Sequence, residues 1–159
     1  MRLPSRPFHW LGLLLVPGLL GLGTFPARAE PPEAVLDALF GNERRTVALQ
    51  TLAERESLGP DEGFRVVEVA RDTHTSHHLV WIRDREVPHR HDRHDLVVVM
   101  LRGHGTMWLG DEERAVGQGS ILYVPRGTPH AFRNASGEPA AAYAVYVPPF
   151  DPEDRQPVD

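Results

Sequence analysis

Residues Gly119 to Asn134 read GSILYVPRGTPHAFRN, and no other part of the chain constrains the architecture as tightly. Pro125 and Gly127 are spaced as in a tight turn, because proline presets one backbone angle and glycine accepts a left-handed conformation. A short β-type segment precedes the turn, and another begins after it at His130. The turn therefore fixes where the imidazole of His130 arrives relative to the preceding strand.

A second informative stretch, Pro88 to Asp95, reads PHRHDRHD. Alternate residues of a strand point to the same face, so His89 and His91 can present two imidazoles side by side. One ligand from a neighbouring strand, such as His130, would complete a facial set of three. Neutral imidazole suits several divalent transition metals, and the sequence does not choose among Fe, Mn, Zn, Ni and Cu.

Short β-type segments surround these two stretches. They recur at intervals of about 8–12 residues, mostly separated by glycine, proline, aspartate or asparagine, which is typical of a sandwich or barrel. Nothing between residues 64 and 147 has the periodicity of a βαβ unit, so we predict an all-β fold. The expected strands are residues 64–70, 78–83, 95–101, 106–109, 121–124, 130–133 and 141–147.

The two stretches together resemble the motifs of the cupin superfamily. The second cupin motif, Gly-x5-Pro-x-Gly-x2-His-x3-Asn, is matched at every defined position by Gly119, Pro125, Gly127, His130 and Asn134. The first motif, Gly-x5-His-x-His-x3–4-Glu-x6-Gly, is matched by His89, His91 and Gly103. The resemblance covers residues 64–147 and implies a small jelly roll or β-barrel with a metal inside its mouth.

The first motif departs from the family at its glutamate ligand. Counting back from Gly103 places that position at Leu96, which cannot coordinate a metal, whereas counting forward from His91 reaches Asp95. We favour the nearby His94 as the replacement, because an imidazole reaches further than an aspartate. The expected ligands are therefore His89, His91, His130 and His94, with Asp95 as the alternative fourth ligand.

The resemblance leaves several functions open. Cupins with three histidines and an open coordination position include oxygenases and isomerases of small organic molecules. A closed site with four neutral ligands would instead favour a non-catalytic module that binds a metal or a small molecule such as a sugar. The sequence assigns no catalytic residue, and it does not rank Arg83, Arg126 and Arg133 as substrate-binding cations.

Composition narrows the chemistry further. The 159 residues suit one ordinary domain, and the absence of cysteine excludes disulfides and thiolate nucleophiles. All 17 basic residues are arginine, which excludes lysine-dependent Schiff-base and P-loop chemistry. The formal charge of −5 disfavours nucleic acid and favours cations over anionic substrates. The expected partners are a small-molecule ligand or substrate and a second copy of the chain in a homodimer.

The N-terminus reads as a secretory signal peptide. A basic opening precedes the apolar run Trp10–Gly23, which is too short to span a membrane, and Ala27-Arg28-Ala29 supplies the cleavage site. Cleavage after Ala29 removes three arginines and no acidic residue, leaving 130 residues with a formal charge of −8. We therefore expect a periplasmic or secreted protein that does not associate with the membrane after cleavage.

The segments that flank the expected barrel are less regular. Residues 30–63 form a lead-in segment in which apolar spacing predicts a short helix over Pro32–Phe40, ended by Gly41-Asn42. Residues 148–159 form an acidic, proline-rich tail that we expect to be loosely held. Four histidines outside the motifs are expected at the surface, and they are His74, His77, His78 and His104.

Overall fold

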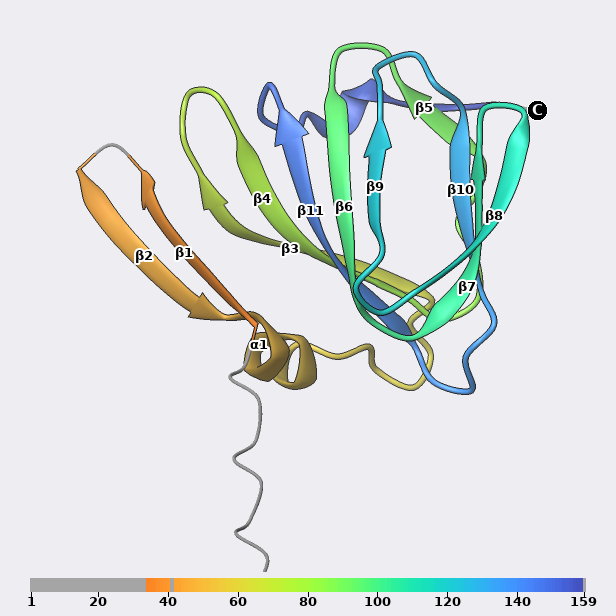
Figure 1. The fold of residues 1–159 in the computed structure, drawn as a ribbon, viewed down its shortest axis with the longest axis horizontal. Coiled ribbons are helices and arrows are strands. Elements are labelled where there is room, and N and C mark those ends of the chain that lie inside the picture. Colours follow the sequence, from red (N-terminus) through yellow and green to blue (C-terminus); the bar gives the residue numbers. More distant parts are fainter. Residues whose placement is uncertain (1–33, 41, 159) are drawn as a thin grey trace, which may run out of the picture. The chain divides into compact units, whose positions relative to one another are not determined.

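A computed structural model describes residues 34–40 and 42–158, which fold mostly as β-strands. Two five-stranded antiparallel sheets enclose a barrel (Figure 1), with strand orders β12-β5-β10-β7-β8 and β3-β4-β11-β6-β9. The strands are β1 (Val35–Phe40), β2 (Glu43–Ala48), β3 (Phe64–Arg71), β4 (Ser76–Ile82), β5 (His89–His91), β6 (Asp95–Arg102), β7 (His104–Leu109), β8 (Glu112–Gly117), β9 (Ile121–Val124), β10 (His130–Asn134), β11 (Ala140–Val147) and β12 (Arg155–Pro157). The helices are α1 (Leu49–Arg55) and the 3-10 turn η1 (Pro152–Asp154). The prediction of a mostly β fold is confirmed.

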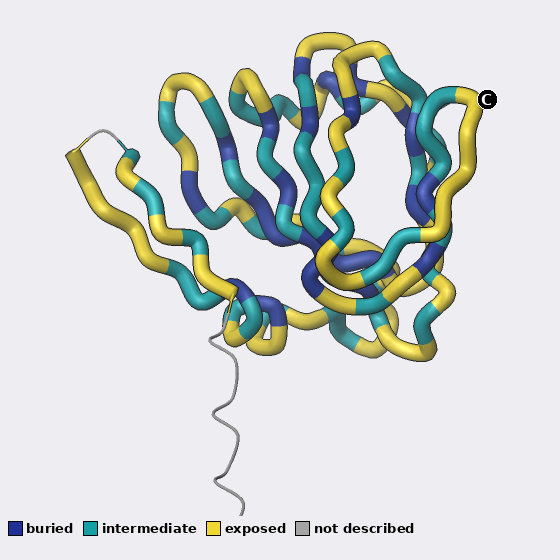
Figure 2. The backbone as a smooth tube through the Cα atoms, viewed as in Figure 1, coloured by how far each residue is buried: buried dark blue, intermediate teal, exposed yellow. Residues whose placement is uncertain are grey.

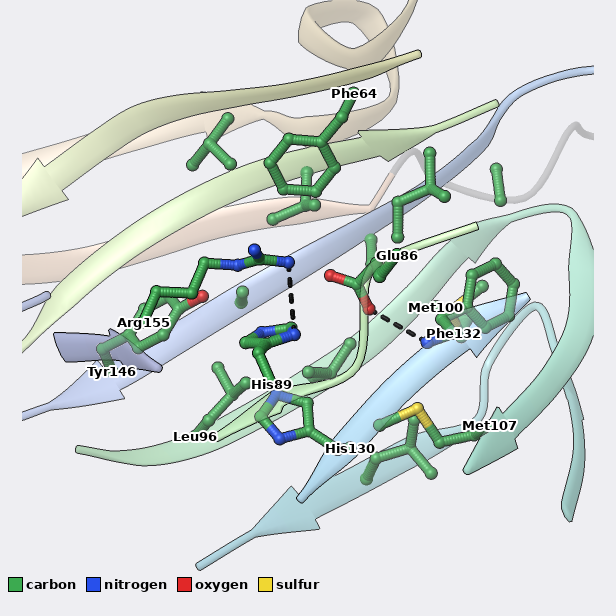
Figure 3. Close-up of a pocket in the computed structure, with 18 of the residues that line it drawn as sticks. Phe64, Glu86, His89, Leu96, Met100, Met107, His130, Phe132, Tyr146 and Arg155 are labelled. Atoms are coloured by element: carbon green, nitrogen blue, oxygen red, sulfur yellow. Dashed lines mark hydrogen bonds between the residues drawn. The ribbon is translucent and has the colours of Figure 1, made fainter. Parts of the chain in front are cut away.

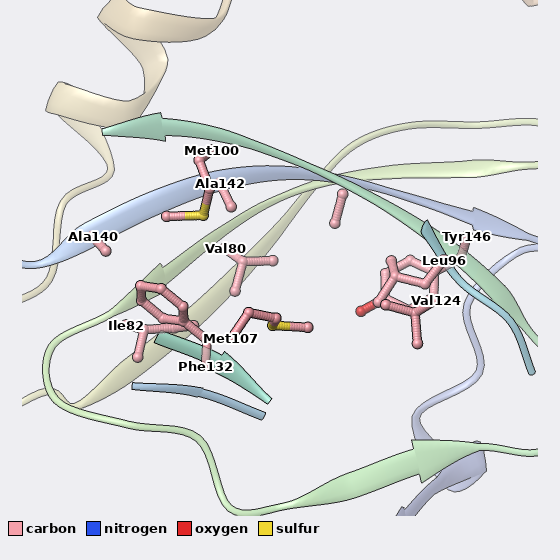
Figure 4. Packing of buried hydrophobic residues seen from close by; sticks show 11 residues of the cluster. Val80, Ile82, Leu96, Met100, Met107, Val124, Phe132, Ala140, Ala142 and Tyr146 are labelled. Atoms are coloured by element: carbon pink, nitrogen blue, oxygen red, sulfur yellow. The ribbon is translucent and has the colours of Figure 1, made fainter. Parts of the chain in front are cut away.

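The core of the barrel lies between the two sheets (Figure 4). Burial alternates along most strands, as expected where one face meets the interior and the other meets solvent (Figure 2). The apolar side chains that fill the interior are Val80, Ile82, Leu96, Met100, Met107, Val124, Phe132, Ala140, Ala142, Ala144 and Tyr146. These residues also form much of the lining of the cavity described below.

The second sheet is buried on both faces near β4 because α1 covers its outer side. Leu79 and Trp81 point outward from β4 and pack with Leu49 and Ala53 of the helix. The indole Nε1 of Trp81 also donates to the carbonyl of Ala53 at 3.1 Å. This double coverage explains why β4 reads as a continuous apolar run instead of an alternating one.

The segment before α1 differs from the prediction. Residues 35–40 form β1, which pairs with β2 in an antiparallel hairpin, so the predicted helix over Pro32–Phe40 is wrong. The Gly41-Asn42 pair that suggested a helix end is equally a hairpin signal between two β-type segments. The predicted signal peptide and its predicted cleavage site lie outside the described residues. Within the described part of the chain, no helix is long and apolar enough to span a membrane.

The C-terminal tail also differs from the prediction, because it is an ordered part of the first sheet. Strand β12 pairs with β5, with Arg155 opposite His91 and Pro157 opposite His89. The amide of Val158 adds a hydrogen bond to the carbonyl of Pro88 at 3.0 Å. The expectation of a loosely held tail is therefore wrong, since its polar side chains and backbone find partners about 60 residues away.

The turn between β9 and β10 has the geometry that its sequence requires. Gly127 has a φ of 78°, and Thr128 N donates to the carbonyl of Pro125 at 3.1 Å, as in a type II turn. The amide of Gly127 donates to the carbonyl of His91 at 2.6 Å. This contact joins the two histidine-bearing stretches and brings His130 beside β5.

Candidate metal centre

Three histidines from two adjacent strands meet at the mouth of the barrel. His89 and His91 face inward from β5 with exposures of 3% and 2%, while Arg90 between them is exposed. His130, the first residue of β10, lies directly opposite His89 in the antiparallel register. The His130 ring lies 4.4 Å from the ring of His89 and 5.5 Å from that of His91, centroid to centroid. One ring nitrogen from each histidine lies within 4.8 Å of the other two.

Each of these rings is oriented by a main-chain carbonyl. The Nδ1 atom of His89 faces the carbonyl of Val87 at 2.9 Å, and that of His130 faces the carbonyl of Thr128 at 3.0 Å. The Nδ1 atom of His91 faces the carbonyl of Asp154 at 3.3 Å. A proton on Nδ1 satisfies each carbonyl and leaves the Nε2 lone pair free, which is the tautomer that a metal requires.

The chemistry of this donor set fits a divalent transition metal. Nε2 of His91 is buried and has no hydrogen-bond partner among the described residues, a costly arrangement unless a ligand completes it. Burial lowers the pKa of His89 to about 3 and that of His91 to about 4, and the neighbouring His130 adds to both effects. Burial also lowers the pKa of His130. The three imidazoles are therefore neutral at pH 7, the form that binds metals.

The two candidates for a fourth ligand are placed differently from each other. His94 is buried beside His91, but its Nδ1 faces the Asp154 carboxylate at 2.5 Å and its Nε2 faces the Pro149 carbonyl at 3.0 Å. Both ring nitrogens of His94 therefore already have a hydrogen-bonding neighbour. Asp95 is not brought to the site, because its carboxylate is bound by the Arg126 guanidinium at 2.7 Å. His94 is not part of the triad's group, but it forms a second group with His91 and Asp154 whose ligand atoms lie within 4.8 Å of one another and could hold a metal ion.

Leu96 stands where the family motif has glutamate, and it lines the cavity beside the histidines. The cavity measures about 90 Å³, and it reaches about 750 Å³ only when the open space at its mouth is included. His89 and His130 form part of its wall, and most of the remaining lining is apolar (Figure 3). His89 and His130 therefore face a cavity with a largely apolar lining.

Glu86 supplies a carboxylate to this pocket (Figure 3). Its Oε2 accepts from the amide of Phe132 at 3.0 Å, and its own amide donates to the Phe132 carbonyl at 2.9 Å. Burial raises its pKa to about 6, although the Phe132 hydrogen bond and Arg155 oppose the shift. A carboxyl group that titrates near neutral pH inside a pocket is suited to general acid–base chemistry.

Asp154 connects the C-terminal tail to the centre. Its carboxylate accepts from the amide and the Nε of Arg93, at 3.0 and 3.2 Å, and from His94. Burial raises the pKa of Asp154, but these hydrogen bonds outweigh burial and leave it below its usual value. Its carbonyl orients His91, so the anchored tail acts directly on a candidate ligand.

The remaining histidines divide between the surface and the core. His74 and His104 are exposed and His77 is half-buried, but His78 is only 3% exposed. The surface prediction for His78 is therefore wrong. Its Nε2 bonds Ser76 Oγ at 2.8 Å, and its ring packs edge-on against Tyr146.

Comparisons with known proteins agree with this architecture. The family model for the cupin domain matches residues 76–146. An uncharacterized protein of Aquifex aeolicus is 33% identical over 105 residues, covering 66% of this chain and 84% of the relative. The crystal structure of TT1209 from Thermus thermophilus aligns with a TM-score of 0.55 and 25% identity over 61% of this chain and 94% of that one. Streptomyces Pac13, a nucleoside dehydratase, aligns with a TM-score of 0.52 and 18% identity over 60% of this chain and 78% of that one.

The chain belongs to the cupin superfamily. The structure brings His89, His91 and His130 together as a group that could hold a metal ion, as the motif spacing predicts. The motif spacing did not predict three further polar residues of the site, because their contacts are with residues distant in the sequence. These residues are Glu86, Asp154 and Arg155.

We predict about one equivalent of metal per chain, lost when His89 and His91 are both replaced by alanine. Asp154→Ala releases the tail that orients His91, so it should weaken metal affinity by roughly 10-fold. Elemental analysis and titration against a chromophoric chelator measure both effects. His104→Ala, an exposed histidine, is the matched control. Unchanged metal content in the double variant would exclude the triad as the metal site.

We also predict that the metal-free protein loses stability as the pH falls from about 6.5 to about 4. The unfolded chain protonates its histidines near pH 6.5, whereas burial holds the pKa of His78, His89 and His91 at about 4, 3 and 4 in the folded chain. The unfolded state therefore binds more protons across this interval, and stability rises with pH. Urea midpoints measured between pH 4.5 and 8 test the slope. His78→Leu should flatten it and His104→Leu should not.

Proposed function

We propose that this cupin is a metal-dependent enzyme that moves a proton on a small organic molecule, in the manner of an isomerase or lyase. The observation that carries the proposal is that Glu86 lines the same pocket as His89 and His130 of the histidine triad. Three protein ligands with an open position are typical of catalytic metal sites, whereas four are typical of structural ones. The engagement of His94 by Asp154 and Pro149 favours the open arrangement.

The residues divide the chemistry between them. His89, His91 and His130 would hold a divalent metal, which when bound polarises a carbonyl or hydroxyl oxygen of the substrate. Glu86 accepts and returns the proton, since its pKa of about 6 leaves both protonation states accessible near neutral pH. The apolar walls exclude water from the transfer. No such base could be assigned from the sequence.

Glu86 has a structural alternative, because it also satisfies the Phe132 amide. Glu86→Gln separates the two roles, since a glutamine carbonyl still accepts from that amide but the side chain no longer moves a proton. The similarity to Pac13, a nucleoside dehydratase solved with uridine, supports a small-molecule substrate for this pocket. An oxygenase function finds no comparable support among the pocket side chains.

The test is solvent exchange. The metal-loaded protein is incubated in deuterium oxide with a panel of small ketones, aldehydes and 2-oxo acids, and loss of carbon-bound protons is followed by NMR. We expect protein-dependent exchange in at least one member and a 100- to 10,000-fold slower rate in Glu86→Gln. The exposed Glu138→Gln serves as the control. Equal rates in wild type and Glu86→Gln, with metal content unchanged, would contradict the proposed role of Glu86.

We further propose that the chain is exported to the periplasm or secreted, on the basis of the basic, apolar and Ala-x-Ala segments of residues 1–29. Expression of the full chain in a Gram-negative host should yield a mature protein that begins at Glu30, as measured by intact mass after periplasmic extraction. Ala29→Leu should block this processing. An unprocessed wild-type protein in the cytoplasmic fraction would exclude export.

A further inference from the structure

The guanidinium of Arg155 is an unpaired cation on the pocket wall, facing the histidines (Figure 3). No acidic side chain of residues 34–40 and 42–158 lies within 4.0 Å of it. Its hydrogen-bonding neighbours are His89 Nδ1 at 3.2 Å and the Val87 carbonyl at 3.5 Å, and it lies 5.9 Å from the Phe64 ring centroid. The half-buried guanidinium has five donors and only two weak neighbours, so it has donors left for a ligand.

The contact with His89 cannot persist in a metal-loaded centre. Nδ1 of His89 can donate to Val87 or accept from Arg155, but it cannot do both. If His89 held a metal through its other ring nitrogen, the proton would stay on Nδ1, which lies 2.9 Å from the Val87 carbonyl and would donate to it. Arg155 is left without an acceptor on the ring and is free to bind a ligand.

Most of the pocket is apolar, and its polar groups gather near Arg155. Glu86 Oε1 has no hydrogen-bond partner among the described residues, and neither has the hydroxyl of Tyr146, which lies beside Arg155 in Figure 3. We propose that the substrate is a small carboxylic acid, with its carboxylate on Arg155 and its apolar body in the barrel. The proposal rests on the proposed function, because the metal is what frees the guanidinium.

A carboxylate matches the pocket better than a phosphate does. A carboxylate is smaller and less strongly hydrated than a phosphate dianion, so it loses less hydration on entering a pocket with mostly apolar walls. The planar fork of arginine also fits a carboxylate with two parallel hydrogen bonds. A monocarboxylate therefore reaches Arg155 at a smaller desolvation cost than a phosphate does.

The acidic composition of the chain disfavours an anionic ligand, but most of these charges lie further from the pocket than Arg155 does. The formal charge of −5 is spread over the surface, and charges more than about 8–10 Å from the pocket are largely screened at physiological salt. Arg155 acts within hydrogen-bond distance, where screening by salt is weak. Recognition of an anion therefore depends on this residue and not on the net charge.

The test compares phenylacetate with phenylacetamide, which differ in charge but not in apolar body. Binding of each to the zinc-loaded full-length protein is measured by calorimetry. We expect phenylacetate to bind at least about 10-fold more tightly than the amide. Arg155→Gln should weaken phenylacetate by about 10- to 100-fold and change the amide by less than about threefold. Arg90→Gln, an exposed arginine of the adjacent strand, should leave both affinities unchanged.

The zinc affinity of each variant is measured alongside. An unchanged carboxylate-to-amide ratio in Arg155→Gln would assign the selectivity to the metal alone and would overturn the proposal. Failure of phenylacetate to bind would overturn it too, as would loss of zinc from Arg155→Gln, because the guanidinium would then serve to hold His89. Selective carboxylate binding without Glu86-dependent exchange would instead overturn the proposed function and leave this inference standing.

Discussion

The imidazoles of His89, His91 and His130 must be buried, neutral and directed toward one point. The rest of the structure depends on the contacts that hold them there. Two of the holding contacts are local, because Val87 and Thr128 lie only two residues before the histidines that they orient. The third is not, because the carbonyl that orients His91 belongs to Asp154, 63 residues along the chain. The barrel alone can therefore orient the rings of His89 and His130. The tail must dock before the ring of His91 is fixed. Docking of the tail therefore completes the first sheet through β12 and the candidate metal centre through η1.

Much of the fold was predictable because its signals are local. The spacing of Pro125, Gly127 and His130 sets the turn that joins β9 to β10, and strand alternation places His89 and His91 on one face. Residues 35–40 were misassigned because their apolar spacing satisfies a helix as well as a hairpin with one polar face. The tail was misassigned because composition reports how polar a segment is and not whether its polar groups find partners.

The site was predictable only where its residues lie in a motif. Arg155 and Arg126 are the same residue type, yet one faces the pocket and the other is neutralised by Asp95 on the second sheet. Glu86 reaches the pocket through a pair of hydrogen bonds to Phe132, 46 residues away. No spacing rule contains such contacts, because they arise from the register between strands that are distant in sequence. The candidate metal ligands could therefore be predicted from local spacing. The polar residues proposed to bind substrate could not, because tertiary contacts place them in the pocket.

Leu96, in place of the glutamate of the family motif, changes the charge of the centre as well as its coordination. A divalent metal on three neutral imidazoles keeps its full charge, whereas a carboxylate ligand would cancel half of it. With Arg155 beside the metal, the loaded pocket would be positive inside an acidic protein, even though Glu86, with a pKa of about 6, is mostly ionised at pH 7. The charge of the protein surface mainly affects the association rate of a ligand, whereas charges that contact the bound ligand mainly affect its dissociation rate. Selectivity for an anion should then reside in slow dissociation, because the acidic surface gives such a ligand no advantage in association.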